Sequence, residues 1–266
     1  MKIVQLIHKS LIDYNLFIAI CTVSFFHFCS QIFRISYPIE LYLFGFFSTL
    51  ATYNLFRYYN DFKQFVVGNQ SVRFWVVVTS LLIALTCFLF FEIEIKLAFC
   101  CLGFLTFFYK FDLIWKMHLR KVPFLKLPII VLVWVISGCI FSLLNPVLNI
   151  SNNQIWIFIV IQSLYFAAIS IPFDVFGLIE DNIVTIPSKI GVKRAFLFSK
   201  ILLIIAVSIG FFLSNNSFFQ LPFLLFGGIT LLFIQLCESL ENKHLQFYLL
   251  DGSILLQTII FLLFSL

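Results

Sequence analysis

Hydrophobic residues in this chain form nine long runs separated by shorter polar connections. A helix that crosses a bilayer needs roughly 20 apolar residues, and the runs lack the alternation of polar and apolar positions that membrane β-strands show. The pattern therefore predicts an all-α, polytopic membrane bundle with nine transmembrane helices. The predicted helices cover residues 11–33, 39–56, 74–91, 95–111, 127–144, 155–172, 196–213, 218–237 and 247–266.

Composition supports lipid as the solvent for most of the chain. Of the 266 residues, 62% are hydrophobic and 11% are charged, and the mean hydropathy is +1.09. Soluble domains contain about 45–50% apolar and about 25% charged residues. We therefore expect a single transmembrane domain over residues 1–266. The net charge of +5 is spread over short basic clusters, which is typical of membrane topology and does not indicate a nucleic-acid partner.

The basic residues also predict how the chain is oriented. Of the 17 Lys and Arg residues, only Arg34 and Lys96 lie in the first, third, fifth or seventh connection. The others lie in the N-terminal segment and in the second, fourth, sixth and eighth connections, and the cytoplasmic side of a membrane protein carries the excess of Lys and Arg. We expect a multi-pass protein of the cell membrane with a cytoplasmic N-terminus, an outside C-terminus and its functional face in the cytoplasm.

The second and sixth connections resemble each other across 120 positions. The segment 54–61 aligns with the segment 174–181, and each follows the second helix of a four-helix set. In both segments polar residues stand seven positions apart, which returns to nearly the same face of a helix. The sequence thus predicts two four-helix quasi-repeats followed by a ninth helix, with polar groups from both repeats meeting at one cavity. Chance similarity between two cytoplasmic helix ends is the alternative interpretation.

Two motifs give the chain a resemblance to a known family. Residues 170–191 read SIPFDVFGLIEDNIVTIPSKIG, and residues 119–126 read LRKVPFLK. With nine helices and acidic segments after the second and sixth, the chain resembles the UbiA superfamily of membrane prenyltransferases, as a divergent member. The resemblance implies transfer of an isoprenoid chain from a prenyl diphosphate to a hydrophobic, often aromatic, acceptor inside the bilayer.

The resemblance also implies a set of site residues. Asp174 and Asp181 would be catalytic and would bind Mg²⁺, with Asp61 as a further candidate ligand, because Mg²⁺ prefers oxygen ligands and bridges phosphates. The diphosphate would be bound by Arg57, Lys110 and Asn54, since Arg and Lys bind phosphate oxygens. A snorkelling role at the membrane edge is the alternative for both cations. An apolar tunnel would exclude water from the reacting allylic group.

The acidic motifs of this chain are incomplete. The family pattern that starts at Asn54 would place acids at positions occupied by Tyr58 and Phe62, and the middle acid of the second motif is replaced by Gly177. A full two-metal site is therefore not expected. Three possibilities follow: a single Mg²⁺ lies between Asp174 and Asp181, the diphosphate is bound without full metal support, or the chemistry has been lost.

Two other functions remain open from the sequence. A non-catalytic isoprenoid- or partner-binding relative would explain the missing acids. A small-solute transporter would explain the internal duplication, although the ionisable residues gather at one face instead of mid-membrane. Among the remaining polar residues, Gln162 and Gln257 are expected to hydrogen-bond between helices, and Asp251 is expected to cap the ninth helix.

Overall fold

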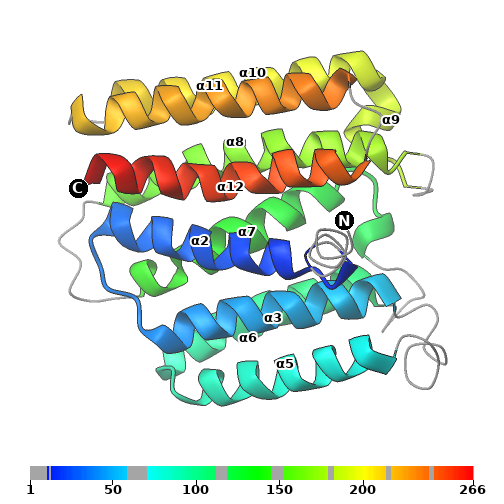
Figure 1. Ribbon diagram of the computed structural model, residues 1–266, viewed down its shortest axis with the longest axis vertical. Coiled ribbons are helices and arrows are strands. Elements are labelled where there is room, and N and C mark those ends of the chain that lie inside the picture. Colours follow the sequence, from blue (N-terminus) through cyan, green and yellow to red (C-terminus); the bar gives the residue numbers. More distant parts are fainter. Residues whose placement is uncertain are drawn as a thin grey trace, which may run out of the picture. The chain divides into compact units, whose positions relative to one another are not determined.

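The computed structural model describes residues 11, 13–58, 71–111, 119–144, 152–178, 183–213, 217–239 and 243–265 (Figure 1). Within these ranges the regular structure is helical, and no strand occurs. The predictions for Asp61 and Asp181 fall outside the described residues. An all-helical membrane protein is thus confirmed as the fold class.

Nine described helices contain 18 or more residues, and each overlaps one of the predicted transmembrane segments. Seven of them are long and apolar enough to cross a membrane. The two others are α3, which includes polar residues such as Asn54 and Arg57, and α6, which carries Glu94, Lys96 and Lys110. Nine membrane crossings therefore stay a prediction. The helices are α2 (Leu16–Phe33), α3 (Ile39–Tyr58), α5 (Ser71–Leu89), α6 (Ile93–Lys110), α7 (Lys126–Leu143), α8 (Asn152–Phe176), α10 (Val192–Leu213), α11 (Ser217–Ser239) and α12 (Lys243–Ser265).

The chain divides into two compact units, Met1–Lys96 and Leu97–Leu266, with the boundary in the first turn of α6. Each unit is described by itself. The expectations of a single domain and of two four-helix repeats plus a ninth helix stay predictions.

In the first unit, α3 packs against both α2 and α5 (Figure 1). The contact between α2 and α3 is close because Gly45 faces the ring of Phe26, where a Cβ atom would lie 2.6 Å from the ring. Small residues allow such approach between membrane helices, and polar side chains add hydrogen bonds across them. Thr49 donates to Thr22 at 3.1 Å, and the His27 ring lies 3.4 Å from the hydroxyl of Tyr42.

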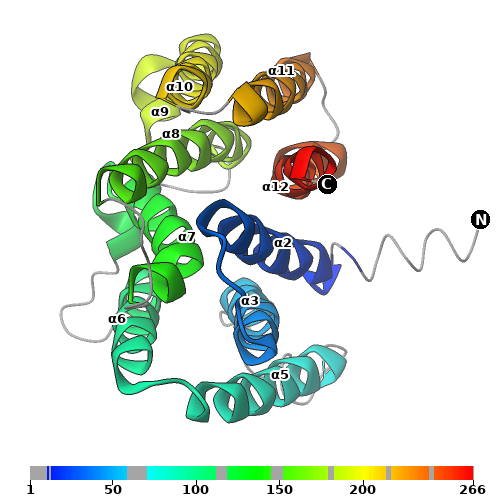
Figure 2. The same ribbon diagram turned by 90° about the vertical axis from the view of Figure 1, so that its left-hand side faces the viewer.

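In the second unit, α8 is the helix with the most neighbours. It packs between α7 and α10 and also contacts α11 and α12, while α11 packs against both α10 and α12 (Figure 2). Tyr165 and Phe166 of α8 are among the largest fully buried side chains of the protein. The Phe166 ring stacks on Trp134 of α7, and the Tyr165 ring meets Phe226 of α11 edge-on. Aromatic packing on several sides thus fixes the position of α8.

Helix α8 continues through an internal proline. Pro172 has no N–H group, so the carbonyl of Ala168 four residues earlier lacks its normal helical donor. Ser199 of α10 replaces that donor, because its hydroxyl lies 2.6 Å from the Ala168 oxygen and both residues are buried. Backbone groups in a membrane must be satisfied inside the protein. The Ser199 bond therefore lets α8 extend four residues beyond Pro172, to Phe176.

One sequence prediction is wrong in this unit, and a second one lies partly outside the described residues. Asp251 does not cap the ninth long helix, because α12 begins at Lys243 and Asp251 is its ninth residue. Helix α8 ends at Phe176, and a turn follows at Gly177 and Leu178, so the helix that carries Asp174 stops before it reaches Asp181. The prediction that Asp174 and Asp181 lie on one face stays a prediction, because Asp181 lies outside the described residues. The run of polar residues after Phe176 was taken as a continuing helix because sequence periodicity marks helix ends poorly.

Candidate functional site

The charged centre of the second unit is an ion pair between Lys126 and Asp174. Lys126 is the first residue of α7, and Asp174 lies in the last turn of α8. The Lys126 Nζ atom is 2.7 Å from Asp174 Oδ1, and the two side chains are 13% and 7% exposed. This distance is typical of a charge-assisted hydrogen bond. The structure thus holds the predicted carboxylate against a lysine from the neighbouring helix.

The helix dipoles make this pairing informative. A cation at a helix N-terminus and an anion at a helix C-terminus are both unfavourable, because the partial charges of the helix ends have the same sign as the side chain. Lys126 and Asp174 both stand at the unfavourable end of their own helix. Neither charge is therefore explained by stabilisation of its own helix. Each is stabilised by the other.

The segments that precede α7 and follow α8 are joined by the backbone. The Phe124 N–H donates to the Val184 carbonyl at 3.1 Å, two residues before Lys126. Phe124 adopts a left-handed conformation with φ of 62°. Val184 then leads into the short helix α9 (Ile186–Ile190), which packs against α8 and α10. This connection holds the start of α7 beside the end of α8, and it therefore keeps Lys126 close to Asp174.

Helix α9 begins at a compact turn. The Thr185 N–H donates to the Ser188 hydroxyl oxygen at 2.9 Å, and Ser188 in turn donates to the Thr185 carbonyl at 2.7 Å. Pro187 stands in the first turn, where its fixed φ suits a helix start and its missing N–H costs nothing. The Thr-Ile-Pro-Ser stretch that resembles the family motif therefore builds a local turn next to the end of α8.

Cations dominate this end of the unit. The described helices and connections that begin or end here carry more Lys and Arg residues than carboxylates, which are Asp174, Glu238 and Asp251. The basic residues are Arg120, Lys121, Lys126, Lys189, Lys193, Arg194, Lys200 and Lys243. Among the described charged residues at this end, cations therefore outnumber carboxylates.

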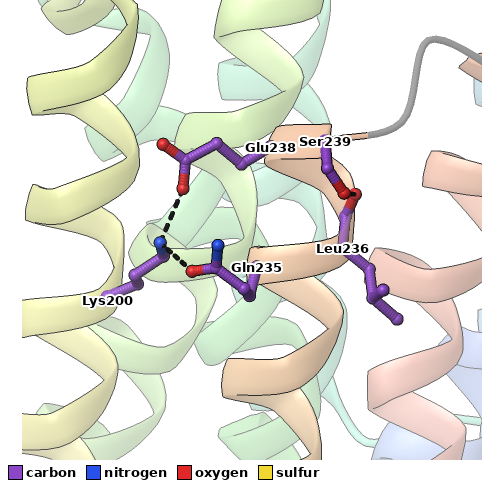
Figure 3. A network of polar contacts seen from close by, with 5 residues as sticks. All are labelled: Lys200, Gln235, Leu236, Glu238 and Ser239. Atoms are coloured by element: carbon purple, nitrogen blue, oxygen red, sulfur yellow. Dashed lines mark hydrogen bonds and ion pairs between the residues drawn. The ribbon is translucent and has the colours of Figure 1, made fainter.

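A second ion pair at this end differs in its surroundings (Figure 3). Lys200 of α10 lies 2.6 Å from Glu238 of α11 and also donates to Gln235. The two charged side chains are 21% and 30% exposed, well above the values for Lys126 and Asp174. The Lys200 pair joins two helices at their surface, whereas the Lys126 pair is enclosed.

The middle of α8 carries neutral polar groups instead of charges. The Tyr165 hydroxyl and the Ser253 hydroxyl of α12 are 2.7 Å apart and buried. Phe173 stacks on Phe247 at 5.2 Å between ring centroids, so the two helices run antiparallel in a fixed register. Gln162 of α8 and Gln257 of α12 each lie about one turn along their helix from the hydroxyl pair, in the same direction.

Both glutamines are buried, with 0% and 1% exposure. Neither side-chain amide of Gln162 or Gln257 has a hydrogen-bond partner among the described residues. The prediction that they lie between helices is consistent with their positions, but the expected hydrogen bonds are not formed. One turn away, Tyr165 and Ser253 form a hydrogen bond between the same two helices.

Three further predicted site residues lie within the described ranges. Asn54 is fully buried, and its amide nitrogen donates to the carbonyls of Tyr14 and Leu50, both at 2.8 Å. Arg57 is exposed in the last turn of α3, and Lys110 is the last residue of α6. Asn54 and Arg57 belong to the first unit and Asp174 to the second. Their predicted convergence on one cavity therefore stays a prediction.

The described residues do not provide a set of ligands for Mg²⁺. No group of three or more His, Cys, Asp or Glu side chains that could hold a metal occurs among them. Of the three predicted Mg²⁺ ligands, Asp174 lies within the described residues. Its Oδ1 atom accepts a hydrogen bond from Lys126. Mg²⁺ binding by Asp174 with Asp181 or Asp61 stays a prediction, because both of those residues lie outside the described part.

Lys126 was not among the residues predicted from the sequence. It entered the sequence analysis as one of several basic residues in the fourth connection and as the last residue of the motif at 119–126, without a role of its own. Its signal was its place directly before a long apolar run, where a lysine is commonly a membrane-edge anchor. Nothing in the sequence specifies that its partner is a carboxylate 48 positions later, because that pairing arises from the packing of α7 against α8.

Comparison with known proteins supports one fold. No family model matches the sequence, and no curated protein matches it either. A solved structure does match: the apo structure of a UbiA homolog from Aeropyrum pernix K1. It aligns with a TM-score of 0.60 over 94% of this chain and 97% of that chain, at 13% sequence identity. The chain is therefore a multi-pass helical membrane protein with a UbiA-like fold.

Proposed function

We propose that this protein transfers an isoprenoid chain from a prenyl diphosphate to a hydrophobic, aromatic acceptor within the membrane. The observation that supports this most strongly is the position of Asp174. It lies in the last turn of α8, where the sequence matches the second acidic motif, in a chain with a UbiA-like fold along nearly its whole length. The cationic surroundings of Asp174 suit a diphosphate.

In this reaction the bond between C1 of the prenyl chain and the diphosphate oxygen breaks, and the diphosphate leaves with the electron pair. A carbon of the acceptor forms the new bond to C1 and then loses a proton. Cations beside the diphosphate stabilise the negative charge that develops on it. Lys126 is the described group beside Asp174 that would do this, with Arg57 and Lys110 as further candidates.

The proposal includes a topology. The basic ends of α7, α8 and α10 lie on the cytoplasmic side, with the N-terminus inside and the C-terminus outside, as the distribution of Lys and Arg indicates. Water-soluble diphosphate is then released into the cytoplasm, while the prenyl chain and the acceptor stay in the bilayer.

The direct test is prenyl transfer by the purified full-length protein in lipid nanodiscs. Labelled farnesyl, geranylgeranyl and longer diphosphates are offered with Mg²⁺ and a panel of aromatic acceptors. We expect a prenylated product and loss of at least about a hundredfold in rate for Asp174→Ala. Asp181→Ala should have a similar effect, whereas Glu180→Ala and the surface variant Lys200→Gln should stay near wild type. Absence of both product and released diphosphate with every donor would contradict the proposal.

A non-catalytic isoprenoid-binding protein is the second candidate. The observation that favours it is the engagement of Asp174 by Lys126, together with Gly177 at the position of a motif acid. The two functions differ in one measurement. A binder retains labelled prenyl diphosphate intact through repeated incubation with acceptors, whereas a transferase converts it to product and free diphosphate.

A further inference from the structure

We propose that Lys126 takes the place of a divalent metal at Asp174, so that this site binds a prenyl diphosphate without Mg²⁺. This inference rests on the proposed function, because it names how the same site binds its donor substrate. It departs from the Mg²⁺-dependent binding that the family resemblance implies.

The position of Lys126 Nζ is the first argument. The atom lies 2.7 Å from Asp174 Oδ1. A Mg²⁺ ion bound to that oxygen would stand about 2.0–2.1 Å from it. Two cations that share one carboxylate oxygen repel each other, so the ammonium group competes directly with a metal. With Lys126 in place, Asp174 has the charge partner that a metal ligand would otherwise need.

The enclosure of the pair is the second argument. A buried ion pair is weak evidence for stability, since the loss of hydration offsets the attraction between the charges. Both helix dipoles also disfavour these two charges at their positions. This salt bridge adds little to stability, yet α7, α8 and the Phe124–Val184 hydrogen bond hold it in place. A role in binding a ligand explains it better than a role in folding.

The chemistry of the lysine is the third argument. An ammonium group has three N–H donors, and one is directed at Asp174. An ammonium group can therefore contact a carboxylate and a phosphate oxygen at the same time, with Asp174 holding the nitrogen in place. The N-terminus of α7 adds to this, because its cap residue Leu125 offers no side-chain hydrogen bond and helix N-termini favour anions. Asp174 is then a positioning residue for Lys126.

The assignment predicts how binding depends on metal. With Lys126 as the cation, removal of divalent ions by EDTA should change the affinity for a prenyl diphosphate by less than about threefold. Loss of a charge-assisted contact to the diphosphate should weaken binding by about tenfold to a hundredfold. Lys126→Gln should therefore weaken binding much more than EDTA does, and Lys126→Arg should restore most of the affinity.

The experiment is equilibrium binding of labelled geranylgeranyl diphosphate to the full-length protein in nanodiscs, with Mg²⁺ or with EDTA. The set comprises wild type, Lys126→Gln, Lys126→Arg, Asp174→Asn and the double variant Lys126→Gln/Asp174→Asn. The double variant leaves no unpaired charge, so it should fold even where a single variant does not. Lys200→Gln is the matched control, because it removes an ion-paired lysine at the same end of the unit.

Three outcomes separate the two proposals. Binding that survives EDTA and weakens in the Lys126→Gln and double variants, but not in Lys200→Gln, supports the inference. Binding that disappears with EDTA and is indifferent to Lys126 overturns the inference and leaves prenyl-diphosphate binding intact. Absence of binding by wild type under both conditions overturns the proposed function, and the inference with it.

Discussion

Helix α8 carries polar side chains in two places that follow different rules. Its last turn holds Asp174 in a full ion pair with Lys126, while its middle holds Gln162 and Tyr165, which are neutral. Charges far from the membrane edge are costly, and neutral hydrogen bonds are the common way to join membrane helices. The difference indicates that the end of α8 is built around charge, which suits an ionic substrate, and that its middle is built for packing.

The largest expected effect comes from breaking the charged end. Lys126→Met or Asp174→Leu alone leaves one buried charge without its partner and should cost about 3–5 kcal/mol of stability. The double variant Lys126→Met/Asp174→Leu should be close to wild type or more stable. Thermal unfolding in detergent measures all three.

The surface ion pair is the control for that series. Lys200→Gln removes an equally short but more exposed contact and should cost no more than about 1 kcal/mol. Equal losses at Lys200 and Lys126 would mean that burial does not distinguish the two pairs, and the contrast between the enclosed and the surface pair would be lost.

A smaller loss of stability is expected between the charged end and the neutral middle of α8, where Pro172 interrupts the hydrogen bonds of the helix. Ser199→Ala removes the donor to the Ala168 carbonyl and should cost about 1–3 kcal/mol, because a buried acceptor is left unsatisfied. In a Pro172→Ala background the backbone regains its own donor, so the same change should cost clearly less. An identical cost in both backgrounds would show that Ser199 does not compensate for the proline.

The smallest effect, and one of opposite sign, is expected in the middle of α8. Gln162 and Gln257 bury amides without partners among the described residues, so Gln162→Leu/Gln257→Leu should be as stable as wild type or up to about 1 kcal/mol more stable. A loss of more than 1 kcal/mol in the unfolding experiment would show that the two amides bind each other or another polar group.

The helices were predicted well because a long apolar run in a membrane satisfies its backbone hydrogen bonds by forming a helix. Each of the nine runs overlaps a described helix, and the end of α6 at Lys110 was predicted to within one residue. Helix ends in polar segments were harder. The seven-residue spacing of Asp174 and Asp181 implied a continuing helix, yet α8 stops at Phe176, because a turn at Gly177 ends the periodicity.

The site was predicted only in part, for a physical reason. Asp174 stands out as a carboxylate at the end of an apolar run, so its importance is readable from the chain. The identity of its partner depends on how α7 packs against α8, which local sequence does not encode. Lys126 therefore resembles an ordinary membrane-edge lysine until the structure places it 2.7 Å from Asp174.

The central claim is that a prenyl diphosphate binds at the Lys126–Asp174 pair without a metal. An experimental structure of the protein with a non-hydrolysable prenyl thiodiphosphate, prepared in EDTA, tests it most directly. We predict a phosphate oxygen within hydrogen-bond distance of Lys126 Nζ while Asp174 still accepts from the same lysine. A diphosphate bound elsewhere, or bound only when a metal ion coordinates Asp174, would contradict the account.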